Sequence, residues 1–371
     1  MDKSDIFNIP KDRLLSIFSD IVSEKVEDFH VRYEHRKNSE NGIMGEFRIP
    51  TVTCRIASGD ITEFTLFVRR RKKADIGRLQ AHHYAFLSNK GVPVPRLYGA
   101  LPDEQGREVI FLEHLEEIAE TEEDFYRDMK NLKEFLELMA RFNSVRLTVD
   151  YAAEIGWDMA ERDFTMNWKT WMTWSIFVLD YIEKNAEKDL FDERIKRFCR
   201  SGEPGINSLK RVALELAYVI PSLTVGYIHG DFLPGNTGWR KDPRELVVFD
   251  FEDVLLDTRF YDIAFFIGGW DIEGKHPVTQ RELAEIYLEN YIRHGGDKIN
   301  IEDFIREIML VWYARKLNLW EYLPADMLGA PSYDSGMPGE KREERLDLVY
   351  TNLHILLNEL GTVYSILELK Q

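Results

Sequence analysis

The stretch "YIHGDFLPGN", residues 227–236, carries a histidine, an aspartate and an asparagine within a short loop rich in Gly and Pro. An apolar run then ends in "VVFDFED", residues 247–253, which supplies a second aspartate. Phosphoryl transfer needs little covalent chemistry from a protein. It needs a group that holds the attacking hydroxyl and accepts its proton, and oxygen ligands for the magnesium ion that accompanies ATP. The spacing therefore predicts a phosphoryl-transfer site.

Three side chains of this stretch could divide the work. Asp231 can orient and deprotonate a hydroxyl group, while Asn236 and Asp250 carry the hard oxygen atoms that Mg²⁺ prefers. A loop aspartate, an asparagine five positions later and an aspartate after the next hairpin is the arrangement of protein kinases. Gly230 stands where those kinases carry an arginine. Turn chemistry explains any one of these residues alone, but the three in this order favour the catalytic interpretation.

The same residues carry a resemblance to a family. "HGDFLPGN" followed by "VVFDFED" resembles the aminoglycoside phosphotransferase and choline kinase group of small-molecule kinases. "GVPVPRLYGAL", "VIFLEHLE" and "DTRFYDIAFF" are similar to that group's Val-Pro-Val-Pro connector, hinge strand and Asp-Leu-Ala segment, and they occur in the family's order.

The resemblance implies a kinase-like fold with ATP and magnesium as cofactors. It implies that His229 orients the loop by hydrogen bonding and that Asp262 supports it. The adenine of ATP is expected to bind the backbone between Glu113 and Leu115, and Asp250 is expected to bind the metal.

The segment that should touch the phosphates departs from the kinase pattern. Kinases pair a lysine of the third strand with a glutamate of the following helix. In "TLFVRRRKK" the corresponding position is Arg69, or Arg70 if the register slips by one, and the helix position is Gln80. An arginine can bind two phosphate oxygens through its planar group, so nucleotide binding is expected to survive. "NSENGIMGE" resembles a phosphate-covering loop only in its position and its small polar residues.

The pattern of the chain predicts an α+β, two-lobed, protein-kinase-like fold. Alternating segments around "HVRYEH", "EFRIPTVTCRI" and "EFTLFVR" indicate an antiparallel meander, and "DIGRLQAHHYAFLSNKG" indicates one helix. "VPVPRLYGAL" is too rich in proline for a central strand and is expected to be an extended connector. Long amphipathic helices follow. We therefore expect a β-rich nucleotide-binding lobe over residues 1–115 and a helical lobe with the catalytic loop and substrate site over residues 116–371.

Composition limits the partners. The 371 residues carry a net charge of −17, which repels nucleic acid and anionic membranes and favours cationic partners. No run of about 18 apolar residues occurs, and the first residues lack the apolar stretch of a signal peptide. Cys54 and Cys199 are the two cysteines, far apart, so neither a disulfide framework nor a zinc site is expected. A cytoplasmic protein is predicted.

Two further features leave alternatives open. Trp168, Trp171 and Trp174 recur every three residues, so they share one side of a helix, either as core packing or as an aromatic wall for a cationic substrate. The acidic segment "EEIAETEED" is either solvated surface or a rim that attracts amines.

The sequence thus predicts an ATP- and magnesium-dependent phosphotransferase that acts on a hydroxyl of a small molecule. An aminoglycoside, a choline-like compound or an amino alcohol would suit the acidic surface. The alternative is a nucleotide-binding pseudokinase without activity, for which Arg69 and Gln80 are the support. A protein kinase is disfavoured, because Gly230 breaks the triplet and no activation segment is recognisable between Asp250 and Asp262.

Overall fold

The computed structural model describes residues 6–33, 45–71, 77–115, 117–118, 128–147, 164–185, 193–200, 205–251, 254–273, 278–319 and 339–369. The chain divides into two compact units. The first holds the described residues up to Val145 together with those of Asp231–Val254, and the second holds those of Arg146–Val149, Asp158–Gly230 and Leu255–Gln371. The lobe boundary expected between residues 115 and 116 stays a prediction.

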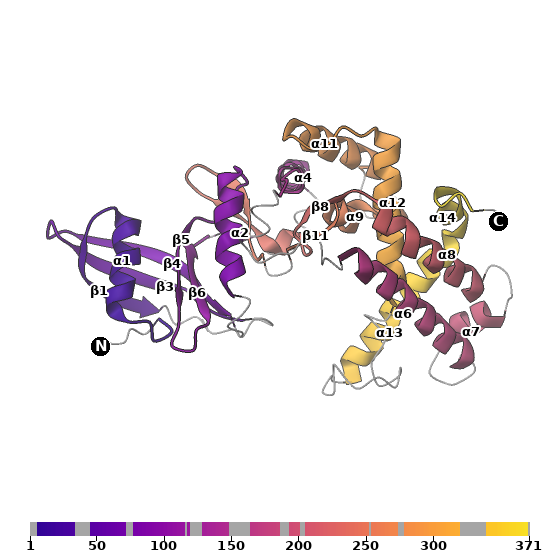
Figure 1. Cartoon of the computed structure of the whole chain (residues 1–371), viewed down its shortest axis with the longest axis horizontal. Coiled ribbons are helices and arrows are strands. Elements are labelled where there is room, and N and C mark those ends of the chain that lie inside the picture. The colour runs from indigo at the N-terminus through magenta and orange to yellow at the C-terminus, as the bar shows by residue number, and fades with distance from the viewer. Residues whose placement is uncertain are drawn as a thin grey trace. The chain divides into compact units, whose positions relative to one another are not determined.

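The first unit is organised around an antiparallel sheet (Figure 1). Its strand order is β1-β3-β4-β6-β5, and β2 pairs with β4. The strands are β1 (Val26–Tyr33), β2 (Gly45–Arg48), β3 (Pro50–Ile56), β4 (Ile61–Arg71), β5 (Leu97–Pro102) and β6 (Glu108–Glu113). The predicted meander is confirmed as β1, β3 and β4. The expected connector is in part a strand: β5 begins two residues after Pro95 and lies at the sheet edge, where a preceding proline interrupts no ladder.

An N-terminal helix that the sequence analysis did not predict covers one face of this sheet. Helix α1 (Lys11–Val22) buries Leu14, Ile17 and Phe18 against the strands. Side chains alternate between the two faces of a strand, so Val68 on β4 points into this core. Its neighbours Phe67 and Arg69 therefore face the opposite side of the sheet.

That opposite side carries helix α2 (Gly77–Asn89), which packs on β5 and β6. The helix ends before Gly91, whose φ of +75° is the left-handed conformation that glycine adopts without strain. The predicted helix at this place is confirmed.

The rest of the first unit is built on α4 and a hairpin. Helix α4 (Met129–Asn143) is capped at its N-terminus by Asp128, whose side chain accepts the N–H of Lys130. The hairpin consists of β9 (Thr237–Arg240) and β10 (Glu245–Val248), and β7 (Glu117–Ile118) pairs with β9. Helix α4 packs against β10, which fixes the hairpin on a rigid support.

The second unit is mainly helical (Figure 1). Its helices are α6 (Phe164–Asn185), α7 (Glu193–Arg200), α8 (Ile206–Val219), α9 (Tyr261–Ile267), α10 (Trp270–Glu273), α11 (Gln280–Arg293), α12 (Ile301–Leu317), α13 (Gly339–Asn358) and α14 (Leu360–Ile366). Helix α6 packs along α8, and α12 packs on α9. A two-stranded ladder of β8 (Val225–Ile228) and β11 (Leu255–Thr258) leads into the candidate catalytic loop.

The predicted fold class, a two-lobed α+β fold, is confirmed. One unit is a sheet with few helices, and the other is mainly helical. The segment proposed as a phosphate-covering loop lies almost entirely outside the described residues, as does most of the acidic segment 116–124. No helix in the described part of the chain is long and apolar enough to cross a membrane.

Candidate active site

The candidate catalytic loop begins in the second unit, where Asp262 holds its backbone. The Asp262 carboxylate accepts the N–H of His229 at 2.9 Å and the N–H of Gly230 at 3.0 Å. Both His229 and Asp262 are buried. Gly230 has a φ of +85°, a conformation that strains any residue with a side chain, so the missing arginine has a backbone reason. These contacts agree with the supporting role expected for Asp262, while the role of the His229 side chain stays a prediction.

A second buried carboxylate stiffens the ladder behind the loop. Asp257 on β11 accepts the indole N–H of Trp168 at 2.7 Å and the N–H of Thr258 at 2.6 Å. Burial raises the pKa of the Asp257 carboxyl to about 6, although the bond from Trp168 opposes this shift. Sequence reasoning missed Asp257, because nothing in its local pattern distinguishes it from a strand-end residue.

The tryptophan stripe splits between the two alternatives. Trp168 is fully buried, and Trp171 packs its ring edge-on against Trp168, with centroids 5.1 Å apart. Trp174 is instead 45% exposed and contacts Phe177, which is also exposed. Core packing therefore explains Trp168 and not Trp174.

The rest of the candidate catalytic loop lies in the first unit. Asn236 donates from Nδ2 to the Asp231 carboxylate at 2.9 Å and to the Asp231 carbonyl oxygen at 2.8 Å. Because the amide nitrogen faces Asp231, the amide oxygen is left as the end of Asn236 that can bind a metal. Buried Phe232 anchors the loop by packing against Phe135 and Phe142 of α4. The structure therefore brings the predicted base and one predicted metal ligand into direct contact.

Asp250, the other predicted metal ligand, follows β10 and lies beside Asn236. The N–H of Phe249 donates to the Asn236 carbonyl at 3.0 Å, and the N–H of Asp250 contacts the Tyr84 hydroxyl at 3.3 Å. Asp250 has a φ of +68°, which is uncommon for a residue other than glycine. Such strain occurs often at functional sites, where the surrounding structure holds it in place.

Arg69 reaches Asp250 directly. Its Nη1 lies 2.6 Å from Asp250 Oδ1, and the arginine side chain is 15% exposed. Arg70 faces the other side of the sheet, where it pairs with Glu46 at 2.6 Å and stacks on Phe7. Of the two arginines left open by the sequence, Arg69 is the one that faces Asp250.

Gln80, expected as the partner of Arg69, is 1% exposed. Among the residues that the structure describes, neither its Oε1 nor its Nε2 has a hydrogen-bond partner. An unpaired buried amide destabilises a protein by about 1–3 kcal/mol. The predicted Arg69–Gln80 pair is therefore not formed here, and Arg69 pairs with Asp250 instead.

A pocket of about 320 Å³ opens beside this ion pair within the first unit. Its walls include Phe67 and Arg69 of β4, Leu112 and Glu113 of β6, and the following His114 and Leu115. Phe47 and Phe67 stack with ring centroids 5.5 Å apart. Burial lowers the pKa of the His114 imidazole, which keeps that ring neutral at pH 7.

The pocket suits a nucleotide in its chemistry. Apolar and aromatic walls fit a base, and the guanidinium group of Arg69 in the lining fits phosphate. Glu113 and Leu115, predicted to contact the base, both line it, together with Phe249 and Asp250. The oxygen donors of Asn236 and Asp250 fit Mg²⁺, which binds few protein ligands and keeps water and phosphate oxygens.

Comparison with known families identifies the class of protein. The model of the phosphotransferase enzyme family matches residues 55–297, which is more than half of the chain. The chain therefore belongs to this family and is a small-molecule kinase. The pseudokinase alternative gains no support from this match, because the family is one of enzymes. A comparison with curated protein sequences found no match.

Solved structures share the fold. An ethanolamine kinase from Plasmodium vivax is 14% identical, with a TM-score of 0.54, and the match covers 90% of this chain and 84% of that one. The GDP complex of aminoglycoside 2'-phosphotransferase-IIIa is 13% identical, with a TM-score of 0.51, covering 93% of this chain and 99% of that one. At these identities the likeness establishes the kinase-like fold.

Proposed function

We propose that the protein transfers the γ-phosphoryl group of ATP, with magnesium, to a hydroxyl group of a small amine-bearing molecule. The observation that carries this proposal is the contact of Asn236 with Asp231, next to Asp250 and the pocket that holds Arg69. This set contains a base, metal-binding oxygens and a cation for phosphate, the parts that phosphoryl transfer requires.

Each residue has a distinct task in this proposal. Asp231 accepts the hydrogen bond of the acceptor hydroxyl and takes its proton as the phosphoryl group leaves ATP. Asn236 orients the Asp231 carboxylate through its Nδ2. Asp250 and the Asn236 oxygen would hold magnesium, which when bound neutralises charge on the phosphates. Arg69 binds phosphate oxygens, and the backbone of Glu113–Leu115 binds the base.

The loop needs Asp262 behind it to work in this way. Asp262 fixes two consecutive N–H groups immediately before Asp231, so the base enters the loop from a rigid backbone. Second-layer hydrogen bonds of this kind set the direction of a catalytic side chain. His229 and Asp262 are thus assigned to orientation and not to proton transfer.

An amine-bearing acceptor has two supports. The chain carries a net charge of −17, which attracts cations to its surface. Both structural neighbours described above are named for reactions on amine-bearing compounds, ethanolamine and aminoglycosides. The same charge disfavours nucleic-acid and membrane partners. A cytoplasmic location stays a prediction from the two distant cysteines.

The test is a screen of hydroxyl compounds with purified protein, ATP and Mg²⁺, in which phosphoester products are detected by phosphorus NMR. Amino alcohols and aminoglycosides are each paired with a compound of the same hydroxyl pattern that lacks the amine. We expect a phosphoester with amine-bearing members and little with their partners. Equal product from both members would refute the amine preference, and hydrolysis of ATP without any phosphoester would refute the phosphotransferase assignment.

A further inference from the structure

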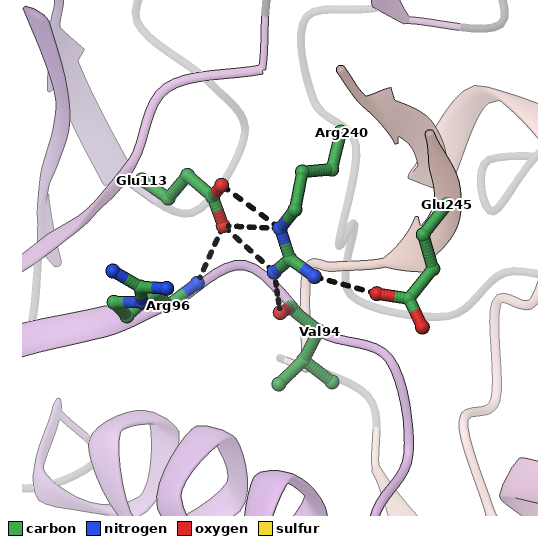
Figure 2. Close-up of polar contacts among 5 residues, drawn as sticks. All are labelled: Val94, Arg96, Glu113, Arg240 and Glu245. Atoms are coloured by element: carbon green, nitrogen blue, oxygen red, sulfur yellow. Dashed lines mark hydrogen bonds and ion pairs between the residues drawn. The ribbon is translucent and has the colours of Figure 1, made fainter. Parts of the chain in front are cut away.

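A second arginine stands behind the same pocket without being part of its walls. Arg240, the last residue of β9, uses all three of its guanidinium nitrogens (Figure 2). Its Nε donates to Glu113 Oε1 at 2.9 Å, and its Nη2 donates to Glu113 Oε2 at 2.8 Å. The same Nη2 donates to the Val94 carbonyl at 2.9 Å, and Nη1 donates to Glu245 at 2.6 Å.

Glu113, which Arg240 binds, is in turn hydrogen-bonded to the backbone of the connector before β5. Its Oε2 accepts the N–H of Arg96 at 3.0 Å (Figure 2). The N–H of Glu113 also donates to the Arg96 carbonyl at 2.9 Å. The Arg240 and Glu113 side chains are 19% and 20% exposed, so water screens the pair less than it screens a surface pair. Burial alone would raise the pKa of the Glu113 carboxyl, but bonds from Arg240 and Arg96 hold that pKa below its usual value.

The residues that Arg240 and Glu113 hold line or adjoin the part of the pocket expected to meet the base. Val94 and Arg96 lie on either side of Pro95, which lines the pocket. Glu113 immediately precedes His114 and Leu115, which also line it. One guanidinium group therefore fixes the connector and the hinge segment to each other and to the hairpin. A bidentate arginine–carboxylate pair fixes direction as well as distance.

We propose that Arg240 is a positioning residue that sets the base-binding wall of the nucleotide pocket from behind, by holding the hinge segment at Glu113 and the connector at Val94 in one geometry. This inference rests on the proposed function, since it assigns the pocket to a nucleotide. It predicts that Arg240 acts on the base, whereas Arg69 acts on the phosphates.

The experiment compares ATP and adenosine binding in three variants. Arg240→Gln removes both the positive charge and the fork, which is the pair of N–H groups that binds the Glu113 carboxylate. Arg240→Lys keeps the charge but loses the bidentate geometry. Arg244→Gln is the matched control, because Arg244 is a more exposed cation near the same hairpin and pairs with Glu134 at 3.3 Å. Dissociation constants, KM for ATP, kcat and the unfolding temperature are measured for each.

For Arg240→Gln we expect the dissociation constants of ATP and adenosine to rise together by about tenfold, while kcat at saturating ATP stays within about threefold of wild type. Arg240→Lys should recover part of this loss, and Arg244→Gln should bind both ligands within about twofold of wild type. A merely structural arginine would lower the unfolding temperature without changing adenosine affinity. The parallel loss of both ligands is therefore the diagnostic result.

Several outcomes overturn the proposal. Adenosine affinity within twofold of wild type in folded Arg240→Gln would do so, and so would a loss confined to ATP. If Arg240→Gln does not fold, Arg240→Lys decides: wild-type adenosine affinity in that variant refutes the requirement for the fork. If wild type turns over ATP but Arg240→Gln binds adenosine as tightly as wild type does, the positioning role alone is refuted and the proposed function stands. Wild-type protein that binds neither ligand refutes the proposed function itself.

Discussion

The two halves of the site in the first unit are held together in different ways. In the loop half, Asn236 contacts Asp231 across five residues of sequence. In the pocket half, Arg69 and Asp250 are 181 residues apart and Arg240 and Glu113 are 127 apart. The loop half is therefore a local structure that a short motif can encode, whereas the pocket half depends on distant segments meeting.

The two arginine pairs of the pocket half also differ from each other. Arg69 pairs with Asp250, which is the proposed metal ligand, so in the proposed mechanism this pair would have to rearrange when magnesium and ATP bind. Arg240 pairs with Glu113, whose carboxylate has no assigned role in binding, so this pair can persist through the reaction. The Arg69–Asp250 pair therefore has to open in the proposed mechanism, whereas the Arg240–Glu113 pair can stay closed.

The largest effect is expected from the loop half. Asp231→Asn removes the proton acceptor but keeps a side chain of the same shape. We expect kcat to fall by roughly 10²-fold or more, which is the usual contribution of general-base catalysis. Nucleotide affinity should change little, because Asp231 acts on the acceptor hydroxyl. Steady-state rates and ATP titrations check both parts, and a near-normal rate would remove Asp231 from the mechanism.

The ladder behind the loop should respond to pH through Asp257. Its pKa is raised to about 6 in the folded protein, so folding favours the protonated acid. The free energy of unfolding should therefore fall as the pH rises from about 4 to about 6 and stay low above that range. Asp257→Asn keeps an oxygen that can accept from Trp168 and removes the charge. At pH 7.5 it should be more stable than wild type by up to roughly 3 kcal/mol.

Denaturant unfolding at pH 4 and pH 7.5, followed by tryptophan fluorescence, measures the gap, which is the difference in the free energy of unfolding between each variant and wild type. Glu285→Gln is the control, because that carboxylate is exposed on α11. The gap for Asp257→Asn should nearly close at pH 4, and the gap for Glu285→Gln should stay small at both values. A gap for Asp257→Asn that is equal at the two pH values would contradict the assignment.

The next largest effect is expected on ATP affinity when Arg69 is replaced, and it should differ from the effect of replacing Arg240. Arg69→Ala should weaken ATP by roughly tenfold, since a charge-assisted bond contributes about 1.5–3 kcal/mol. Adenosine, which has no phosphates, should bind as it does to wild type. Arg69→Lys should restore part of the ATP affinity. Paired titrations decide, and an equal loss for both ligands would show that Arg69 serves the sheet rather than the phosphates.

The loop half could be predicted from the sequence, and the pocket half only in part. The motif from His229 to Asn236 and the later Asp250 predicted a kinase, and this class is confirmed by the family match. The motif is informative because spacing within a short loop controls which of its side chains meet. The Arg69–Asp250 contact, the role of Arg240 and the burial of Asp257 depend on register and packing between distant segments. Helix α1 was not predicted, because no motif marks it in the sequence. Strand β5 was not predicted, because the prolines before it indicated a connector.

The smallest effect is expected at Gln80. Its buried amide has no hydrogen-bond partner within the described part of the chain, so an apolar side chain of similar length should fit at least as well. Gln80→Met is expected to stabilise the nucleotide-free protein by about 1 kcal/mol in denaturant unfolding. Gln105→Met, at an exposed turn, is the control and should change little. Clear destabilisation by Gln80→Met alone would mean that the amide is satisfied in solution.

In the proposed mechanism Asp250 gives up Arg69 to hold magnesium with ATP, and calorimetric titration of ATP with and without Mg²⁺ measures this exchange. Wild type should bind ATP more tightly with Mg²⁺. Asp250→Ala should lose this enhancement, because the charged ligand is gone. Without Mg²⁺ that variant should bind ATP at least as well as wild type, because Arg69 is released to the phosphates. Equal magnesium dependence in the two proteins would show that Asp250 does not hold the metal, and no ATP binding by wild type with Mg²⁺ would refute the proposed function.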